Sequence, residues 1–510
     1  MTVAQLLRDA VALDPSHIAI DGDGRTATFG ELDGRADRVA HALIAGGVRR
    51  GERVAFIDRN STEYWDVLFG ALKAGVVLVP LNFRLSPSEV AWALDDCGAR
   101  VVVAGRPFAH LVPAGPTVVV IDGRPGEGSI AYDDWICDTA EGDPGRDAEG
   151  GEYISLIYSS GTTGRPKGVL VSDEQQVWSV GAFGANFDVD AASRSVVPIP
   201  YYHVAGGGWA LVTLTRGGTV IQSREPTAES MFDQLVGHRA THSAMVPAVM
   251  HVLNQSPAAR SADFSALRQL VYGGAPISEP LLRASVATFG ADFFQSYGLS
   301  ETMGVTTLLG PDQHRLDGDL SRLRSAGRAI DGVELEIRDA VDGTRLGVGA
   351  SGEIVVRAPS VTPGYWQRPD ATADAFTADG FFRTGDMGTL DDEGFLYIRD
   401  RIKDMIVTGG ENVYPAEVES VLAGHPAIVD VAVIGVPDER WGEHPLAVVV
   451  ARGDALDPAD VITYAREHMA HYKCPAEVVF VPELPRNPSG KVLKRELRAP
   501  YWIGHDRGIG

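Results

Sequence analysis

The chain has 510 residues, 45% of them hydrophobic, which is more than one hydrophobic core can organise and predicts about three compact units. Asp and Glu (68 residues) outnumber Lys and Arg (45 residues), so the formal net charge is −23. This acidity argues against proteins that bind nucleic acid through its phosphate backbone, and any nucleotide must be held by a local site.

The first residues, MTVAQLLRDAVALDP, predict an amphipathic helix. Arg8, Asp9 and Asp14 stand among its apolar residues, which distinguishes the segment from a secretory signal peptide. No apolar run approaches the ~20 residues that a membrane-spanning helix needs. The three cysteines are odd in number and far apart, which favours neither a disulfide framework nor a zinc site. We therefore expect a cytoplasmic protein without a membrane span.

Residues 28–104 alternate between helical and strand-like patterns. Thr28 precedes a segment of helical spacing, TFGELDGRADRVAHALIAGG, and suits the N-cap position. Helical spacing returns at 61–75 and 86–98, and strand-like runs stand at 53–58, 76–81 and 100–105. Strands that alternate with helices predict βαβ units and a largely parallel sheet.

The pattern changes further along the chain. Gly, Asp and Ala dominate residues 121–150, which we interpret as mostly surface connection, and a second α/β stretch follows over 152–310. Short alternating segments then predict a small, mostly antiparallel β unit, with strands at 333–339, 352–358 and 394–400. A short αβ segment after Asp400 holds apolar runs at 431–436 and 446–451. The predicted fold class is α/β with a β-rich subdomain.

The stretch YSSGTTGRPKGV (158–169) is the most informative part of the sequence. It follows YISLIY, which suits a buried strand, and its glycines let backbone amides converge on an anion. Its hydroxyl groups can donate to phosphate oxygens, and Lys167 adds a positive charge. The P-loop pattern of NTPases fails, because Pro166 precedes Lys167 and Gly168 follows it. A solvated turn is the alternative interpretation for a loop of this composition.

Together with the motifs described next, this string resembles the adenylate-forming superfamily of acyl-CoA synthetases, stand-alone adenylation domains and firefly-type luciferases. Bacterial fatty-acyl-CoA ligases are the most similar group, and the resemblance covers nearly the whole chain. It implies a large N-terminal adenylation domain of α/β sheets over 1–402 and a smaller, mobile α+β C-terminal domain over 403–510. It also implies that 158–169 is the mobile loop that grips the β- and γ-phosphates of ATP. The implied phosphate-binding residues are Ser159, Ser160, Gly161, Thr162, Thr163, Gly164, Lys167 and Ser300.

The segment PYYHVAGG (200–207) resembles the family segment that borders the acyl pocket. The resemblance places His203 beside the substrate carboxylate, as a catalytic residue. A lone histidine is more often structural, but the order of the motifs favours the functional interpretation. The implied acyl-pocket residues are His203, Ala205, Gly206, Gly207, Trp209, Val271 and Ser296.

GGAP (273–276) and SYGLSE (296–301) resemble the family's adenine and metal segments. The flat ring of Tyr297 suits stacking on a purine, and Glu301 is a hard oxygen ligand suited to Mg²⁺ on ATP phosphates. Relatives usually have Gly and Thr where this chain has Ser296 and Ser300. Ser300 keeps the hydroxyl, whereas Ser296 alters the shape of the acyl pocket. The implied adenine- and ribose-binding residues are Gly273, Gly274, Ala275, Pro276, Ser296, Tyr297, Asp386 and Arg401.

FRTGD (382–386) ends in Asp386, whose two carboxylate oxygens suit the vicinal hydroxyls of ribose. The stretch 400–419 resembles the family's hinge and thioester-forming loop. There Arg401 would assist Asp386, and Lys403 matches the hinge position, although a surface lysine is the alternative interpretation. The implied loop for coenzyme A consists of Gly409, Gly410 and Glu411, where small residues let the thin pantetheine chain pass.

PRNPSGKVLKREL (485–497) carries Lys491 at the position of the family's catalytic lysine. In the first half-reaction a carboxylate attacks the α-phosphorus of ATP, and the two anions repel each other unless cations neutralise them. Mg²⁺ on Glu301 and the ammonium of Lys491 would supply that charge. In the second half-reaction a thiol attacks the acyl carbon and the lysine is not required, so a domain hinged at Lys403 could present each group in turn.

Three consecutive glycines, 206–208, follow His203 and open a segment of helical character. Glycine costs about 0.5–1 kcal/mol relative to Ala within a helix. Space beside a ligand is one explanation, and close packing against a neighbouring backbone is an equal alternative. Trp209 either fills that space or supplies a flat apolar wall. No Lys or Arg stands within 200–215, so we expect a large apolar monocarboxylic acid, either a medium-to-long fatty acid or, slightly favoured, a ring-bearing one.

The expected activity is therefore that of an AMP-forming acyl-CoA synthetase with ATP, Mg²⁺ and coenzyme A. An adenylation enzyme that loads a separate carrier protein is an alternative, and so is a luciferase-like oxygenase. A catalytically silent nucleotide-binding relative would be expected to lack Lys491, Glu301 or Asp386, and all three are present. The sequence leaves the oligomeric state open, a homodimer included.

Overall fold

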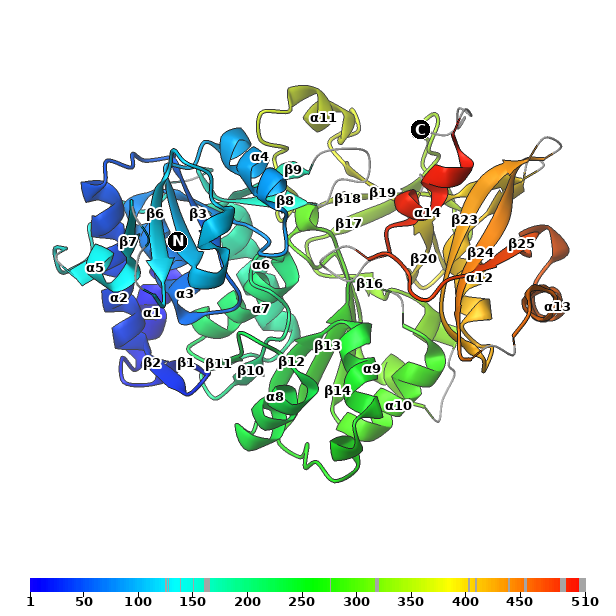
Figure 1. Ribbon diagram of the computed structural model, residues 1–510, viewed down its shortest axis with the longest axis horizontal. Coiled ribbons are helices and arrows are strands. Elements are labelled where there is room, and N and C mark those ends of the chain that lie inside the picture. The colour runs from blue at the N-terminus through cyan, green and yellow to red at the C-terminus, as the bar shows by residue number, and fades with distance from the viewer. Residues whose placement is uncertain are drawn as a thin grey trace.

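The computed structural model of the protein describes residues 1–123, 126, 128–137, 139–149, 151–159, 166–275, 277–316, 321–401, 404–408, 411–438, 441–453, 456–486 and 492–503. Their strands form four sheets (Figure 1). The fold class predicted from the sequence, α/β with a β-rich subdomain, is confirmed. No helix of these ranges is both long and apolar enough to cross a membrane.

The first large sheet has seven strands and contains the predicted βαβ units. Its strand order is β7-β6-β5-β3-β4-β8-β9, and every neighbouring pair is parallel except β8 and β9. The strands are β3 (Arg53–Ile57), β4 (Val77–Pro80), β5 (Val101–Gly105), β6 (Thr117–Ile121), β7 (Ser129–Ala131), β8 (Tyr153–Ser159) and β9 (Lys167–Ser172). The connecting helices are α2 (Phe29–Ala45), α3 (Thr62–Ala74) and α4 (Pro87–Cys97). Thr28 caps α2 in a capping box with Glu31, as its position predicts.

The second large sheet has nine strands in the order β16-β15-β14-β13-β12-β10-β11-β1-β2. The strands are β1 (Ile18–Gly22), β2 (Arg25–Thr28), β10 (Arg194–Val196), β11 (Thr219–Gln222), β12 (His242–Met245), β13 (Gln269–Gly273), β14 (Asp292–Tyr297), β15 (Thr307–Leu309) and β16 (Arg328–Ala329). Its helices are α6 (Asp173–Asn186), α7 (Val204–Thr215), α8 (Ala228–Phe232), α9 (Pro247–Gln255) and α10 (Glu279–Phe289). The early strands β1 and β2 join a sheet whose other strands lie after residue 190, because β1 pairs in parallel with β11.

The main hydrophobic core lies between the two large sheets. It combines residues of α2, α3, α6 and α7 with residues of both sheets, including Trp65, Leu211 and Val271. A second core packs α8, α9 and α10 on the opposite face of the nine-stranded sheet. Side chains alternate along β14 accordingly, so that Phe293 faces the second core and Phe294 faces the main one.

Two smaller sheets follow. The antiparallel sheet β17-β18-β19-β20 consists of β17 (Glu334–Arg338), β18 (Gly352–Arg357), β19 (Phe382–Leu390) and β20 (Leu396–Arg401), which confirms the predicted β unit. The last sheet consists of β21 (Ile406–Thr408), β22 (Glu411–Val413), β23 (Ile428–Asp438), β24 (Gly442–Ala451) and β25 (Glu477–Phe480). The helices around it are α12 (Pro415–Leu422), α13 (Pro458–His468) and α14 (Lys494–Arg498), and together they form the orange and red part of Figure 1.

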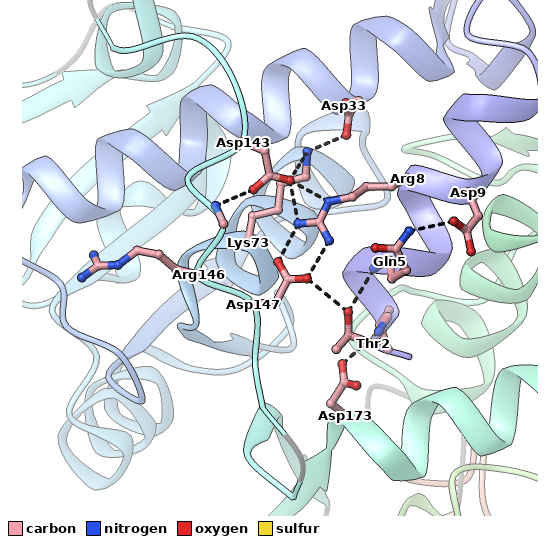
Figure 2. A network of polar contacts seen from close by, with 12 residues as sticks. Thr2, Gln5, Arg8, Asp9, Asp33, Lys73, Asp143, Arg146, Asp147 and Asp173 are labelled. Atoms are coloured by element: carbon pink, nitrogen blue, oxygen red, sulfur yellow. Dashed lines mark hydrogen bonds and ion pairs between the residues drawn. The ribbon is translucent and has the colours of Figure 1, made fainter.

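The stretch 121–150 is more structured than the predicted surface connection. It contains β7 and helix α5 (Tyr132–Cys137), and two of its aspartates hold the amino-terminal helix α1 (Val3–Leu13) in place (Figure 2). The guanidinium of Arg8 donates to both oxygens of Asp147, at 2.6 Å each. Polar composition concealed this role, because the pairing partners lie more than 100 residues away in the sequence.

The same region contains a fully buried lysine. The Lys73 ammonium donates to Asp33 at 2.5 Å (Figure 2). It also donates to Asp37 at 2.6 Å, and the two contacts join α3 to α2. Burial alone would lower the pKa of Lys73, but its hydrogen bonds to both carboxylates outweigh this effect and raise that pKa. The lysine is therefore charged at neutral pH, and the amino-terminal helices are joined by ion pairs as well as by apolar contacts.

Candidate active site

Two predicted nucleotide-binding residues from different sheets meet in the structure. Tyr297 ends β14 of the nine-stranded sheet, and its hydroxyl donates to Oδ2 of Asp386 in β19 at 2.8 Å. Both side chains are buried, with exposed fractions of 8% and 6%. Arg401 in β20 lies directly across from Asp386 in the antiparallel register. The arrangement brings the Tyr297 side chain, the Asp386 carboxylate and the backbone of Arg401 next to one another.

Glu353 and Arg383 lie beside this carboxylate and were not predicted from the sequence. Arg383 forms an ion pair with Glu353 at 3.2 Å. Burial raises the pKa of Glu353, the Arg383 charge opposes this, and the charge of Asp386 adds to the rise. Thr384 donates to the Ile354 carbonyl at 2.7 Å and accepts from the Asp386 amide at 3.1 Å, which fixes the turn before Asp386. The sequence contained one indication of this ion pair, because Glu353 is an acidic residue within the apolar run of β18.

A second group of residues joins the base of the phosphate loop to the candidate metal ligand. Lys167 begins β9, opposite Ser159 at the end of β8. Its ammonium lies 4.7 Å from the ring centroid of Tyr365. The Tyr365 hydroxyl donates to Oε1 of Glu301 at 3.0 Å, in the 3-10 turn Ser300–Thr302 that follows β14. Lys167 and Glu301, predicted separately, are therefore connected through one tyrosine that the sequence analysis missed.

Glu301 suits a magnesium ion that is bound mainly through a nucleotide. Within the described ranges no group of three or more His, Cys, Asp or Glu side chains could hold a metal ion. Mg²⁺ is commonly bound in proteins by one or two carboxylates together with substrate phosphates and water. A single partly buried carboxylate next to the phosphate-loop hairpin fits that donor set, so Glu301 is the residue that would hold the ion.

The acyl side of the site begins at His203, which caps helix α7. Its Nδ1 accepts a hydrogen bond from the Ala205 amide at 3.3 Å. A Cβ on Gly206 would lie 2.5 Å from the carbonyl oxygen of Ile199, and a Cβ on Gly207 would lie 2.6 Å from that of Tyr201. A Cβ on Gly208 would meet no atom within 4 Å. The structure therefore supports close backbone packing at the first two glycines and open space only at the third.

Trp209, a candidate acyl-pocket residue in α7, belongs to a cluster of three aromatic side chains. Phe294 and Ser296 are only partly buried although they lie in an inner strand of the nine-stranded sheet, and Val271 pairs with Phe294 across β13 and β14. Phe187 packs against Phe294 with ring centroids 5.3 Å apart, and Trp209 packs edge-on against Phe187 at 5.1 Å. Trp209 is 2% exposed. Phe187 and Trp209 belong to the main core and Phe294 packs against it, and we refer to the three rings together as the aromatic wall.

Several predicted site residues cannot be placed. Outside the described ranges lie Ser160, Gly161, Thr162, Thr163, Gly164, Pro276, Lys403, Gly409, Gly410 and Lys491. The backbones of Arg401 and Glu411 lie in β20 and β22, and their side chains are not described. Gly273 ends β13 beside Ser296, where a Cβ could not fit against the backbone of β14, and Gly274 has a φ of +74°, so both glycines are required by the backbone here.

Comparison with known proteins identifies the family of the chain. Residues 7–366 match the family described as AMP-binding enzyme, and residues 417–491 match the AMP-binding enzyme C-terminal domain. A fatty acid–[acyl-carrier-protein] ligase, ScoC of Streptomyces coeruleorubidus, is 38% identical over 500 residues, which cover 96% of this chain and 94% of that protein. A feruloyl-CoA synthase of Amycolatopsis sp. is 38% identical over 494 residues, which cover 96% of this chain and 97% of that protein.

A solved structure matches the fold as well. The crystal structure of ATP-bound MatB from Rhodopseudomonas palustris superposes with a TM-score of 0.88 and is 31% identical in sequence. The match covers 99% of this chain and 100% of that chain. The chain therefore shares its fold with a protein that was solved with ATP bound.

Proposed function

Because the chain belongs to the family of AMP-binding enzymes, we propose that it is an ATP-dependent acid–thiol ligase. It would join a carboxylic acid to ATP as an acyl-adenylate, with release of pyrophosphate, and then pass the acyl group to coenzyme A, with release of AMP. The observation that supports this proposal most is the Tyr297–Asp386 contact, because it brings two motifs 89 residues apart together at the place where we propose that adenosine binds.

In the first half-reaction a carboxylate oxygen of the acid attacks the α-phosphorus of ATP. Asp386 would accept hydrogen bonds from the ribose hydroxyls, and Tyr297 would lie against the adenine. Glu301 would hold Mg²⁺, which neutralises phosphate charge when it is bound. Lys491 would donate to the carboxylate and the α-phosphate as charge moves onto pyrophosphate. His203, at the start of α7, would border the carboxylate end of the acid.

In the second half-reaction the thiol of coenzyme A attacks the acyl carbon and AMP leaves. The loop Gly409–Glu411 would line the path of the thiol. Rotation of residues 403–510 relative to 1–402 about Lys403 would withdraw Lys491 and bring this loop to the acyl carbon. Separate positions for the two half-reactions account for the presence of both motifs in one small domain.

The aromatic wall supports a bounded, apolar, ring-bearing monocarboxylic acid over a long unbranched one. Phe187, Trp209 and Phe294 pack against one another, so an extended chain could pass them only if side chains moved. Flat rings offer offset or edge contacts to an aromatic acid. The feruloyl-CoA synthase, 38% identical over nearly the whole chain, supports the same substrate class.

The acyl acceptor has a second candidate. ScoC is named as a ligase for an acyl-carrier protein and is as similar in sequence as the feruloyl-CoA synthase. A carrier protein would present the same thiol on the same pantetheine arm, so the loop Gly409–Glu411 suits both acceptors. Coenzyme A remains the first proposal, and a separate carrier protein is the alternative acceptor.

Acid-dependent exchange of labelled pyrophosphate into ATP tests the proposal. A panel of linear, aryl and polycyclic acids should give exchange without coenzyme A, and single-ring acids should give the highest specificity constants. Addition of coenzyme A should then produce AMP and a thioester. Exchange with no acid of the panel would refute adenylation, and an optimum at acetate or propionate would refute the proposed pocket.

A further inference from the structure

One tyrosine connects the two halves of the candidate phosphate site, which come from different sheets. Lys167 belongs to the β8–β9 hairpin of the seven-stranded sheet, and Glu301 belongs to the turn after β14 of the nine-stranded sheet. Tyr365 contacts both, through its ring and its hydroxyl respectively. The sequence motifs contain Lys167 and Glu301 but not Tyr365.

The backbone around Tyr365 is fixed by hydrogen bonds on both sides. The Leu170 amide donates to the Gly364 carbonyl at 3.1 Å, and the Trp366 amide donates to the Gly168 carbonyl at 2.8 Å. The Thr362 amide donates to the Glu301 carbonyl at 2.7 Å. Residues 362–366 therefore form a strap that is bonded to β9 at one side and to the Glu301 turn at the other.

The side chain is also restrained. Tyr365 is 9% exposed. Burial raises the pKa of its phenol, and the neighbouring Glu301 charge raises it further, so the hydroxyl stays protonated as a donor at neutral pH. Its hydrogen bond of 3.0 Å occupies one oxygen of Glu301 and leaves the second oxygen for another partner. The ring face is occupied by the Lys167 ammonium at 4.7 Å, in the geometry of a cation–π contact.

We propose that Tyr365 is a positioning residue for ATP bound with magnesium. Its hydroxyl would hold the Glu301 carboxylate in the orientation that receives the metal ion, and its ring would hold the Lys167 ammonium beside the phosphates. This inference rests on the proposed function, since it takes Glu301 as the magnesium ligand. A tyrosine that served packing alone would need no hydroxyl at this point, so removal of the oxygen separates the two roles.

The test is ATP binding by isothermal titration calorimetry, with the full-length protein, without acid, at a series of Mg²⁺ concentrations and in EDTA. Tyr365→Phe keeps the ring and removes the donor. It should raise the Mg²⁺ concentration for half-maximal enhancement of ATP binding about 10- to 150-fold, as expected for a lost hydrogen bond to a charged group. Affinity for ATP in EDTA should stay within about twofold, since the Lys167 contact remains.

Three further variants make the result specific. Tyr132 belongs to α5, at the far edge of the seven-stranded sheet (Figure 1), and its hydroxyl donates to Asp66 at 3.1 Å. Tyr132→Phe removes that similar hydroxyl and should change neither measurement. Tyr365→Leu also removes the ring and should weaken ATP binding in EDTA as well. In a Glu301→Gln background, Tyr365→Phe should cause no further shift in the Mg²⁺ dependence.

The inference is overturned if Tyr365→Phe binds ATP with the Mg²⁺ dependence of the wild type. It is also overturned if the variant loses the same affinity with and without Mg²⁺, or if its effect adds fully to that of Glu301→Gln. A wild-type protein whose ATP binding does not respond to Mg²⁺ would instead refute the proposed function, and with it the role of Glu301. The two failures are therefore distinguishable in one set of titrations.

Discussion

Replacement of Gly206 by Ala should destabilise the protein far more than the same replacement at Gly208, two residues further along α7. A Cβ on Gly206 would lie 2.5 Å from the Ile199 carbonyl oxygen and closer still to that of Pro200, both of them backbone atoms. The start of the helix would have to move away from the segment that leads into it. Overpacking of this kind costs about 1–3 kcal/mol.

Gly208 differs in its surroundings. A Cβ there meets no atom within 4 Å, so Gly208→Ala should gain up to about 1 kcal/mol from the better helix propensity of alanine. The two variants should thus differ by about 1–4 kcal/mol in the free energy of unfolding, which urea denaturation can measure. Gly208 lies between the candidate acyl-pocket residues Gly207 and Trp209, and we take the open space beside it as part of the proposed pocket. On that basis we expect Gly208→Ala to raise the KM for the preferred acid while the KM for ATP is unchanged.

Equal stability of the two variants would refute the reasoning, because it would show that the approach of the 199–201 backbone does not constrain α7. A loss of stability at Gly208 as large as that at Gly206 would have the same meaning. An unchanged KM for the acid in Gly208→Ala would show that the open space next to this residue is not part of the acyl pocket.

Three other substitutions give equally definite expectations. Lys73→Met should lower the free energy of unfolding by about 3 kcal/mol at pH 7, because it leaves Asp33 and Asp37 without their cation. Burial already raises the pKa of Asp37, so this loss should shrink as the pH falls and Asp37 becomes protonated; a loss independent of pH would contradict the account. Lys491→Ala should slow adenylate formation by about 10²–10³ but spare thioester formation from supplied acyl-adenylate, whereas equal losses would refute alternation between two positions. Gly409→Trp should block the coenzyme A step and spare pyrophosphate exchange; collapse of both would make Gly409 a structural residue.

The parts of the fold that depend on local patterns could be predicted from the sequence. The alternation of helices and strands over 28–104, the Thr28 cap and the later antiparallel β unit are visible as periodicity and capping residues. The place of β1 could not be predicted, because its partner β11 lies about 200 residues away and a short strand carries no mark of its partner. The same holds for Asp147, which binds Arg8 from a polar stretch with no periodic pattern.

The candidate site shows a similar division. Tyr297, Asp386, Lys167 and Glu301 stand in recognisable motifs, and the structure brings them together in two groups. Tyr365 could not be predicted, since its importance lies in contacts with two residues distant in the sequence. The glycines at 206–208 left two explanations open, and only the distances to the 199–201 backbone separate them. The sequence shows that three consecutive glycines are unusual in a helix, but only the atoms around each glycine show what it is needed for.

The central claim is that the acid is activated through its own carboxylate oxygen at the α-phosphorus of ATP. The most direct test is a single turnover with acid labelled with ¹⁸O in both carboxylate oxygens, in the presence of ATP, Mg²⁺ and coenzyme A, followed by mass spectrometry of the nucleotide. The mechanism predicts AMP that carries one labelled oxygen, because the oxygen that attacks phosphorus leaves with AMP when the thiol attacks the acyl carbon. Unlabelled AMP, or ADP formed together with labelled inorganic phosphate, would contradict it.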